Sequence, residues 1–265
     1  MNIMILFIFL LGLFIGSFLN VLVDRLPRDE SVLKGRSHCE KCKKELAWYD
    51  LIPVLSFVLL KGKCRYCHNP LSFYYPVVEL ITGSMFVLVF LFQNLGIMNH
   101  ELRIMDFVNF GYYIFLVCGL IAIFFADLKY GIIPDAILIF LFLVSLLYLF
   151  IIPTLSLNHF LSGIGALFFF LVLFLVTRGK GMGFGDVKFS FLMGLVLGFP
   201  GVAIALYIAF LTGAVTGSIL IIWRKKRLLG GTIPFGPFLV LGTVIALFYS
   251  TQIIRMASPL LSFWW

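Results

Sequence analysis

Residues 107–126, with the sequence FVNFGYYIFLVCGLIAIFFA, form a stretch of 20 residues without a charged side chain. At the helical rise of about 1.5 Å per residue, a stretch of this length spans the hydrocarbon core of a bilayer, which is about 30 Å thick. The apolar residues run continuously and do not alternate with polar ones, so a strand of a membrane barrel is the poorer interpretation. We therefore predict a membrane-spanning helix at these residues.

Seven further stretches of the chain have the same character. The composition agrees, since 62% of the residues are hydrophobic and 12% are charged, against about 45–50% and 25% in soluble domains. We predict an all-α fold, a polytopic integral membrane bundle of about eight transmembrane helices at 3–22, 73–95, 107–126, 134–152, 159–177, 187–199, 200–223 and 237–255. The first stretch has no basic residue before it and no small-x-small cleavage pattern, so we interpret it as a span. We expect three parts: a first transmembrane helix at 1–22, a polar loop at 23–72 and a transmembrane domain at 73–265.

Lysine and arginine are distributed unevenly between the two sides that eight spans create. Eighteen of the 20 fall in or beside the loops 23–72, 127–133, 178–186 and 224–236, and the other two are Arg103 and Arg255. Because basic loops are retained in the cytoplasm, we expect both termini outside and the first loop inside. The net charge of +8 then reflects retention and attraction to anionic lipid, and nucleic acid is the poorer explanation.

Four of the five cysteines lie in the first loop, in two C-x-x-C pairs. The pairs are Cys39 with Cys42 and Cys64 with Cys67, and 21 residues separate them, which is close to the spacing of zinc-ribbon sites. Disulfides are disfavoured in the reducing cytoplasm, and four thiolates suit zinc. We predict a structural zinc site in a small zinc-ribbon-like loop. The alternative is that the pairs bind no metal, since a lone pair is often incidental.

Four acidic residues lie near the helix ends that we place on the cytoplasmic side, and they are Glu79, Asp127, Asp135 and Asp186. Ionisable residues in or beside spanning helices are costly and usually functional. Two carboxylates from different helices can share one proton. One then acts as general base on a water, while the other, protonated, polarises the scissile carbonyl. This is the chemistry of an aspartic protease.

Asp186 follows a glycine-rich segment, and we expect Gly181, Gly183 and Gly185 there to permit positive φ and close approach of an extended substrate. The plainer interpretation of Gly183-x-Gly185 is a flexible turn with Asp186 as the N-cap of the next helix.

The other three acids have plainer interpretations as well. Asp135, which follows Pro134, is typical of a helix start. Asp127 can be a solvated carboxylate at the membrane edge, and Glu79 can make a hydrogen bond in helix packing.

Taken together and in order, several stretches resemble the signatures of the bacterial prepilin peptidase family, also called type IV leader peptidases. They are residues 16–21 (GSFLNV) with 25–28 (RLPR), the two cysteine pairs, 49–53, 75–80 (YPVVEL), 127–129 (DLK) with 133–135 (IPD), 183–188 (GFGDVK) and 234–238 (PFGPF). The similarity extends along nearly the whole chain. One departure is Glu40, which stands where the first cysteine pair of the family often has proline.

The resemblance implies that Asp127 and Asp186 are the catalytic pair and that Asp135 is not. Within the matching motifs, we expect Gly183, Gly185, Lys188 and Glu79 to support the substrate or the loop.

The resemblance also implies a multi-pass enzyme of the bacterial inner membrane with its active site facing the cytoplasm. Its substrates would be prepilins and pseudopilins of type IV pili, type II secretion or competence systems, cut on the C-terminal side of a glycine. By the same resemblance, S-adenosylmethionine would serve N-methylation of the new N-terminus.

Two other classes of protein remain as alternatives. A transporter also uses membrane acids and glycine-broken helices, but it would place acids near the bilayer middle and show related halves, and neither is evident. A non-catalytic pilus assembly factor would keep the spans and the zinc loop without needing either aspartate. The partners that we expect are the precursor proteins and the lipid bilayer, with no nucleic acid.

Overall fold

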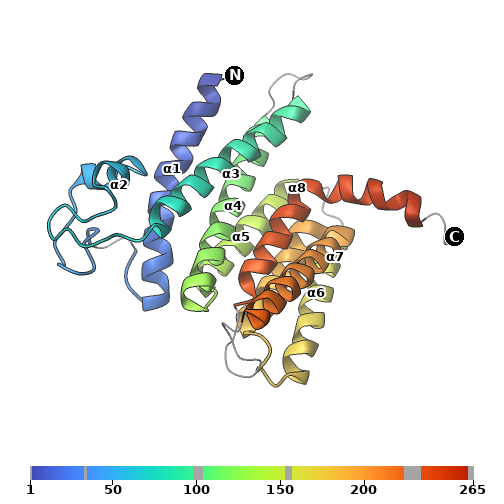
Figure 1. Cartoon of the computed structure of the whole chain (residues 1–265). Coiled ribbons are helices and arrows are strands. Elements are labelled where there is room, and N and C mark those ends of the chain that lie inside the picture. Colours follow the sequence, from blue (N-terminus) through green and yellow to red (C-terminus); the bar gives the residue numbers. More distant parts are fainter. Residues whose placement is uncertain (1, 33–34, 98–103, 153–156, 224–233, 262–265) are drawn as a thin grey trace. The chain divides into compact units, whose positions relative to one another are not determined.

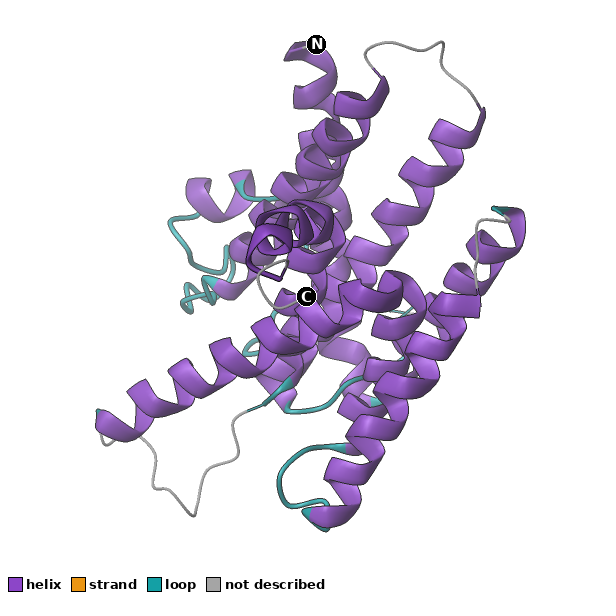
Figure 2. Cartoon of the chain, turned by 90° about the vertical axis from the view of Figure 1, so that its right-hand side faces the viewer, coloured by secondary structure: helices purple, strands orange, loops and turns teal. Residues whose placement is uncertain are grey.

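The computed structural model describes residues 2–32, 35–97, 104–152, 157–223 and 234–261. Its regular structure in these ranges is helical, and the prediction of an all-α fold is confirmed. The α-helices are α1 (Asn2–Arg25), α2 (Leu55–Leu59), α3 (Tyr74–Ile97), α4 (Ile104–Tyr130), α5 (Asp135–Ile151), α6 (Leu157–Val176), α7 (Phe184–Ile222) and α8 (Gly236–Leu261) (Figure 1). Two short 3-10 helices are η1 (Leu26–Arg28) and η2 (Trp48–Leu51). Figure 2 draws no strand in the described residues.

Six of the described helices are long and apolar enough to cross a membrane, namely α1, α3, α4, α6, α7 and α8. The shorter apolar helix α5 has 17 residues. The 39 residues of helix α7 contain both the sixth and the seventh predicted spans. The helix is interrupted between them at Gly198 and Phe199, where the backbone angles are not helical. With α7 taken as two segments, each of the eight predicted stretches coincides with a described helix or helix segment.

The chain divides into two compact units, Met1–Phe125 and Ala126–Trp265, which are described separately. In the first unit α1 packs along α3, and the first loop connects them. In the second unit α6 and α8 both pack along α7. Gly194 of α7 shows how close this packing is, since a Cβ there would lie 2.5 Å from the Cα of Gly163 in α6.

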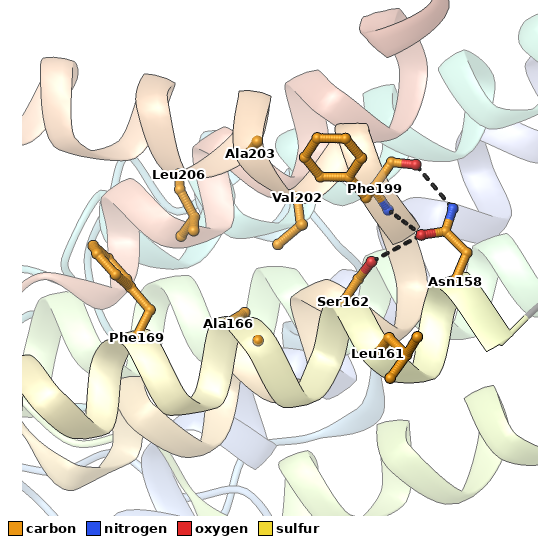
Figure 3. Close-up of a pocket in the computed structure, with 10 residues that line it drawn as sticks. Asn158, Leu161, Ser162, Ala166, Phe169, Phe199, Val202, Ala203 and Leu206 are labelled. Carbon is orange, nitrogen blue, oxygen red and sulfur yellow. Dashed lines mark hydrogen bonds between the residues drawn. The ribbon is translucent and has the colours of Figure 1, made fainter.

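The interruption in α7 is held by a side chain of α6. The amide group of Asn158 donates to the carbonyl oxygen of Phe199 at 2.9 Å, and its oxygen accepts the N–H of Phe199 at 3.2 Å (Figure 3). The break removes these backbone groups from the helical ladder, and an unpaired backbone group is costly in lipid. Asn158 therefore satisfies both groups.

Several helices extend beyond their predicted ends, and two of these extensions concern the candidate acids. Helix α4 continues to Tyr130 and α7 begins at Phe184, so Asp127 and Asp186 both lie inside helices. The apolar pattern marks the part of a helix that suits lipid, and the polar end turns continue past it. Arg103 and residues 224–233, which enter the predicted orientation, lie outside the described residues.

Candidate active site and metal site

The structure brings two of the predicted acids together in the second unit. Asp127 lies in the last turn of α4 and Asp186 in the first turn of α7. Each is 5% exposed, and the two carboxyl groups are near enough to interact electrostatically. Two acids from separate helices therefore share one buried location.

Each of these carboxyl groups accepts a hydrogen bond from a backbone amide at the start of a helix. The N–H of Gly183 donates to Asp186 Oδ2 at 3.1 Å, and the N–H of Gly236 donates to Asp127 Oδ2 at 2.9 Å. The N-termini of α7 and α8 carry partial positive charge, which favours a nearby anion. The pair is thus positioned by α4, α7 and α8 together.

Asp186 is not the N-cap of α7. The helix begins at Phe184, so Gly183 occupies the N-cap position and Asp186 the third helical position. Its carboxylate reaches back to the N-cap amide, as the acidic residue of a capping box does. The plainer interpretation placed Asp186 at the N-cap itself. In the structure Asp186 lies three residues later, and its side chain makes a capping contact from there.

Gly181, Gly183 and Gly185 permit positive φ, but they do not adopt it in the structure. Left-handed backbone occurs earlier, at Arg178 and Gly179, with φ of 51° and 70°. The chain reverses direction there, directly after α6. It is therefore already entering α7 when it reaches the three later glycines.

The beginning of α7 contacts the turn between α4 and α5 and also the first residue of α5. A Cβ at Gly185 would lie 3.1 Å from the Cβ of Ile133, so the absence of a side chain permits this packing. Lys188 Nζ donates to both carboxylate oxygens of Asp135, at 2.7 and 2.8 Å. Both side chains of this ion pair are more than a third exposed, so its contribution to stability is about 0–1 kcal/mol.

Glu79 belongs to the first unit, where it is buried in α3. Its Oε2 accepts the N–H of Val54 in the first loop at 2.8 Å, and the carboxylate also accepts a hydrogen bond from Ser17 of α1. The plainer interpretation expected a hydrogen bond in helix packing. The structure adds the first loop as a partner.

The four loop cysteines also come together, and their sulfur atoms all lie within 4.8 Å of one another. Zn–S bonds of about 2.3 Å in a tetrahedron place the sulfurs about 3.8 Å apart, and Cys39 Sγ lies 3.8 Å from Cys67 Sγ. The geometry therefore fits one tetrahedral metal ion.

The two cysteine pairs fold into the same turn. In each, the fifth residue, Lys43 or His68, has a left-handed φ of 58° or 54°, and its N–H donates to the carbonyl oxygen of the first cysteine at 2.8 or 2.9 Å. The N–H of the first cysteine donates to the carbonyl oxygen of the sixth residue. The first cysteines, Cys39 and Cys64, are buried. Each turn thus presents two thiols to one point.

The thiols differ in the ease of losing a proton. Burial raises the pKa of Cys39, but the backbone N–H groups of Cys42 and Lys41 outweigh it and lower that pKa to about 7. The N–H of Asn69 lowers the pKa of Cys67, but burial and contacts with the other thiols raise it to about 11. Cys39 therefore forms a thiolate, the form that binds metals, more readily than Cys67.

Comparison with known proteins matches a protein-family model to each half of the chain. The Bacterial Peptidase A24 N-terminal domain matches residues 10–93, and the Type IV leader peptidase family matches residues 114–218. The chain is 32% identical over 249 residues to the prepilin leader peptidase/N-methyltransferase of Bacillus subtilis (strain 168), covering 93% of this chain and 95% of that protein. The chain belongs to the type IV leader peptidase family.

Other members with the same name are similarly close. The Aeromonas hydrophila protein is 32% identical over 94% of this chain and 91% of its own length. The Burkholderia pseudomallei (strain 1026b) protein is 31% identical over 92% and 85%. No solved structure matches the chain. In this type IV leader peptidase, the cysteine pairs lie in the matched N-terminal domain and both aspartates in the matched peptidase region.

The sequence alone did not reveal the contact between Gly236 and Asp127. The segment 234–238, PFGPF, was noted only for its resemblance to a family motif, and it lies beyond the matched peptidase region. Proline near the first position of a helix was the available signal, because it predicts that a helix N-terminus begins there. The signal does not say which side chain that N-terminus meets.

Proposed function

We propose that this protein is an aspartic endopeptidase that removes short basic leaders from prepilins or pseudopilins. The cut would fall on the C-terminal side of a glycine, at the cytoplasmic face of the bacterial inner membrane. The observation that carries the proposal is the buried pair of Asp127 and Asp186, each held by a backbone amide, in a chain of the type IV leader peptidase family.

In the proposed mechanism, one carboxylate of the pair takes a proton from the attacking water. The other, protonated, donates a hydrogen bond to the oxygen of the scissile carbonyl, where negative charge develops. The two amides of Gly183 and Gly236 keep the carboxyl groups in place without supplying or removing a proton. Gly185 would support this arrangement by packing against the turn between α4 and α5, and Lys188 by pairing with Asp135 of α5. Within the first unit, Glu79 would support the first loop.

The remaining parts of the proposal concern orientation, metal and a second activity. Both termini would lie outside and the first loop inside, in accord with the uneven distribution of basic residues. Cys39, Cys42, Cys64 and Cys67 would hold a structural zinc ion within the loop 23–72, between a first transmembrane helix at 1–22 and a peptidase domain at 73–265. The names of the relatives support N-methylation of the new N-terminus with S-adenosylmethionine.

The direct test is the mass of the product. The purified protein in detergent is incubated with a prepilin, with and without S-adenosylmethionine, and the products are analysed by intact-mass spectrometry. We expect loss of the leader in both reactions and the additional mass of one methyl group only with the cofactor. An uncleaved precursor would count for a transporter or an assembly factor, while cleavage without the added mass would reject methylation alone.

A substitution at Gly236 tests whether the amide contact positions the acid. A Cβ at this residue would lie 2.6 Å from Asp127 Oδ2, which is closer than any ordinary contact. In the Gly236→Ala variant, the carboxylate of Asp127 must therefore move. Because displacement by about 1 Å can lower a catalytic rate about 100-fold, we expect kcat to fall by about 10- to 100-fold with little change in KM. Cleavage kinetics and thermal unfolding measure the two effects.

Gly165→Ala is the matched control. No atom lies within 4 Å of a Cβ placed at Gly165 in α6, and alanine favours a helix over glycine. We expect this variant to cleave at the wild-type rate. Equal losses in both alanine variants would show that the effect of Gly236→Ala is not specific to Asp127.

A further inference from the structure

The first loop carries an apolar surface that neither the proposed peptidase site nor the metal site uses. It consists of Trp48, Leu51, Leu55, Val58 and Leu59, in η2 and α2. Trp48 is 75% exposed and Leu59 72%. Soluble domains rarely expose many large apolar side chains together, and such patches mark protein or membrane interaction sites. We refer to these five residues as the apolar loop surface.

The hydrogen bonds of Glu79 set the position of this surface along the membrane helices. Glu79 accepts the N–H of Val54, directly before α2, and contacts Ser17 of α1. Glu79 lies five residues past the start of α3 and Ser17 eight residues before the end of α1, which is roughly 7.5 and 12 Å along the axes. Figure 1 accordingly shows α2 beside α1 and not beyond its C-terminal end.

The backbone amide at the turn of Val54 is satisfied by a protein side chain. Its φ of 59° and ψ of −49°, together with the hydrogen bond from the N–H of Leu55 to the carbonyl oxygen of Pro53, describe a γ-turn, which is strained. Irregular backbone at membrane depth is tolerated only where protein satisfies its polar groups. The carboxylate of Glu79, which is 7% exposed, satisfies the amide of Val54.

The charges next to the apolar loop surface suit a lipid headgroup layer. Lys61 and Lys63 follow α2 directly, and both are exposed. Basic residues at a membrane surface are attracted to anionic lipid phosphates, and tryptophan is enriched at the boundary between headgroups and acyl chains. For helices that end at the outer edge of the polar layer, which adds roughly 5–7 Å on each side of the core, a position about 7–12 Å inside their ends lies at this boundary or up to about 5 Å beyond it, toward the acyl chains.

We propose that the apolar loop surface inserts into the lipid bilayer at the boundary between headgroups and acyl chains. The partner is lipid, with the acyl chains contacting Trp48 and Leu59 and the phosphates contacting Lys61 and Lys63. The loop between the cysteine pairs is then an interfacial anchor. It holds the two C-x-x-C turns, which we call the metal turns, against the membrane surface. This inference does not depend on the proposed peptidase activity.

Tryptophan fluorescence of the full chain in lipid vesicles tests the proposal. The chain has four tryptophans, so Trp223, Trp264 and Trp265 are replaced by phenylalanine, which leaves Trp48 as the reporter. The vesicles contain phosphatidylcholine and phosphatidylglycerol. We expect lipids brominated near the top of their acyl chains to lower Trp48 emission severalfold, whereas iodide in the water has little effect.

A second tryptophan reporter and a control reporter ensure that the conclusion does not rest on Trp48 alone. Leu59→Trp with Trp48→Phe, in the same background, should respond to the two quenchers as Trp48 does. Tyr66→Trp with Trp48→Phe places the reporter on the second metal turn, where iodide should quench and the brominated lipids should not.

Three outcomes would overturn the proposal. Strong quenching of Trp48 and the Leu59→Trp reporter by iodide alone would place the surface in water. Protection from both quenchers would show that protein covers it. Protection from iodide that appears only after a prepilin is added would make it a docking site for that protein.

Discussion

Asp127→Asn and Asp186→Asn are each expected to lower the rate of leader cleavage by about 10²- to 10⁴-fold, which is the scale of a lost general acid–base catalyst. The amide side chain of asparagine cannot take a proton from water and cannot serve as a shared proton site. Neither change removes the hydrogen bond to a backbone amide, because the asparagine oxygen still accepts from Gly236 or Gly183. Initial rates with a prepilin substrate measure the effect.

Folding of these variants should be intact, and this separates catalysis from structure. A buried carboxylate is replaced by a neutral group of the same shape, so we expect thermal unfolding within a few degrees of wild type. Asp135→Asn is the matched control, since Asp135 is an exposed acid that pairs with Lys188 near the same site. It should retain most of the activity. Wild-type processing by either of the first two variants would end the dyad proposal.

Removal of the metal should have the second large effect, this time on the structure of the first loop. In the residues of this loop that the structure describes, the regular structure consists of short helices and two isolated β-bridges, His38 with Glu45 and Lys63 with Pro70. Structural zinc contributes about 10–16 kcal/mol of apparent binding free energy in small zinc-finger peptides. We therefore expect Cys39→Ser or Cys64→Ser to abolish stoichiometric zinc and to expose the loop to trypsin. Metal analysis and limited proteolysis measure these changes.

Cys118→Ser is the control for this experiment. Cys118 lies alone in α4, so its replacement should leave zinc content and trypsin resistance unchanged. The cysteine and aspartate variants should also differ from each other, because only the first group should lose the metal. Wild-type protein that is purified without metal and still resists trypsin would contradict the structural role of zinc.

The sequence predicted where the helices lie better than it predicted where they end. The spans followed from length and apolarity, since lipid demands a continuous apolar stretch with every backbone group bonded. The ends of α4 and α7 were placed several residues short, at 126 and 187, because polar end turns carry no apolar signal. The left-handed backbone before α7, at Arg178 and Gly179, was not predicted for a related reason. The sequence shows which residues permit a turn, but not where the chain makes it.

The candidate sites show the same division. Spacing alone indicated that the two cysteine pairs converge, because each C-x-x-C turn is local and a single ion needs both. Position at membrane helix ends, where a charge is costly, indicated four acids, and only the resemblance to the family singled out Asp127 and Asp186 among them. Their hydrogen-bond partners were not predicted, because Gly236 is 109 residues from Asp127.

The sequence by itself therefore predicted the membrane class, the helical stretches and the convergence of the two cysteine pairs. These depend on composition and on contacts between residues that are close along the chain. Tertiary structure alone decided that α8 presents an amide to Asp127, that Lys188 pairs with Asp135, and that Glu79 holds the turn at Val54. Each of these contacts joins separate segments, and only the packing of helices brings such segments within hydrogen-bonding distance.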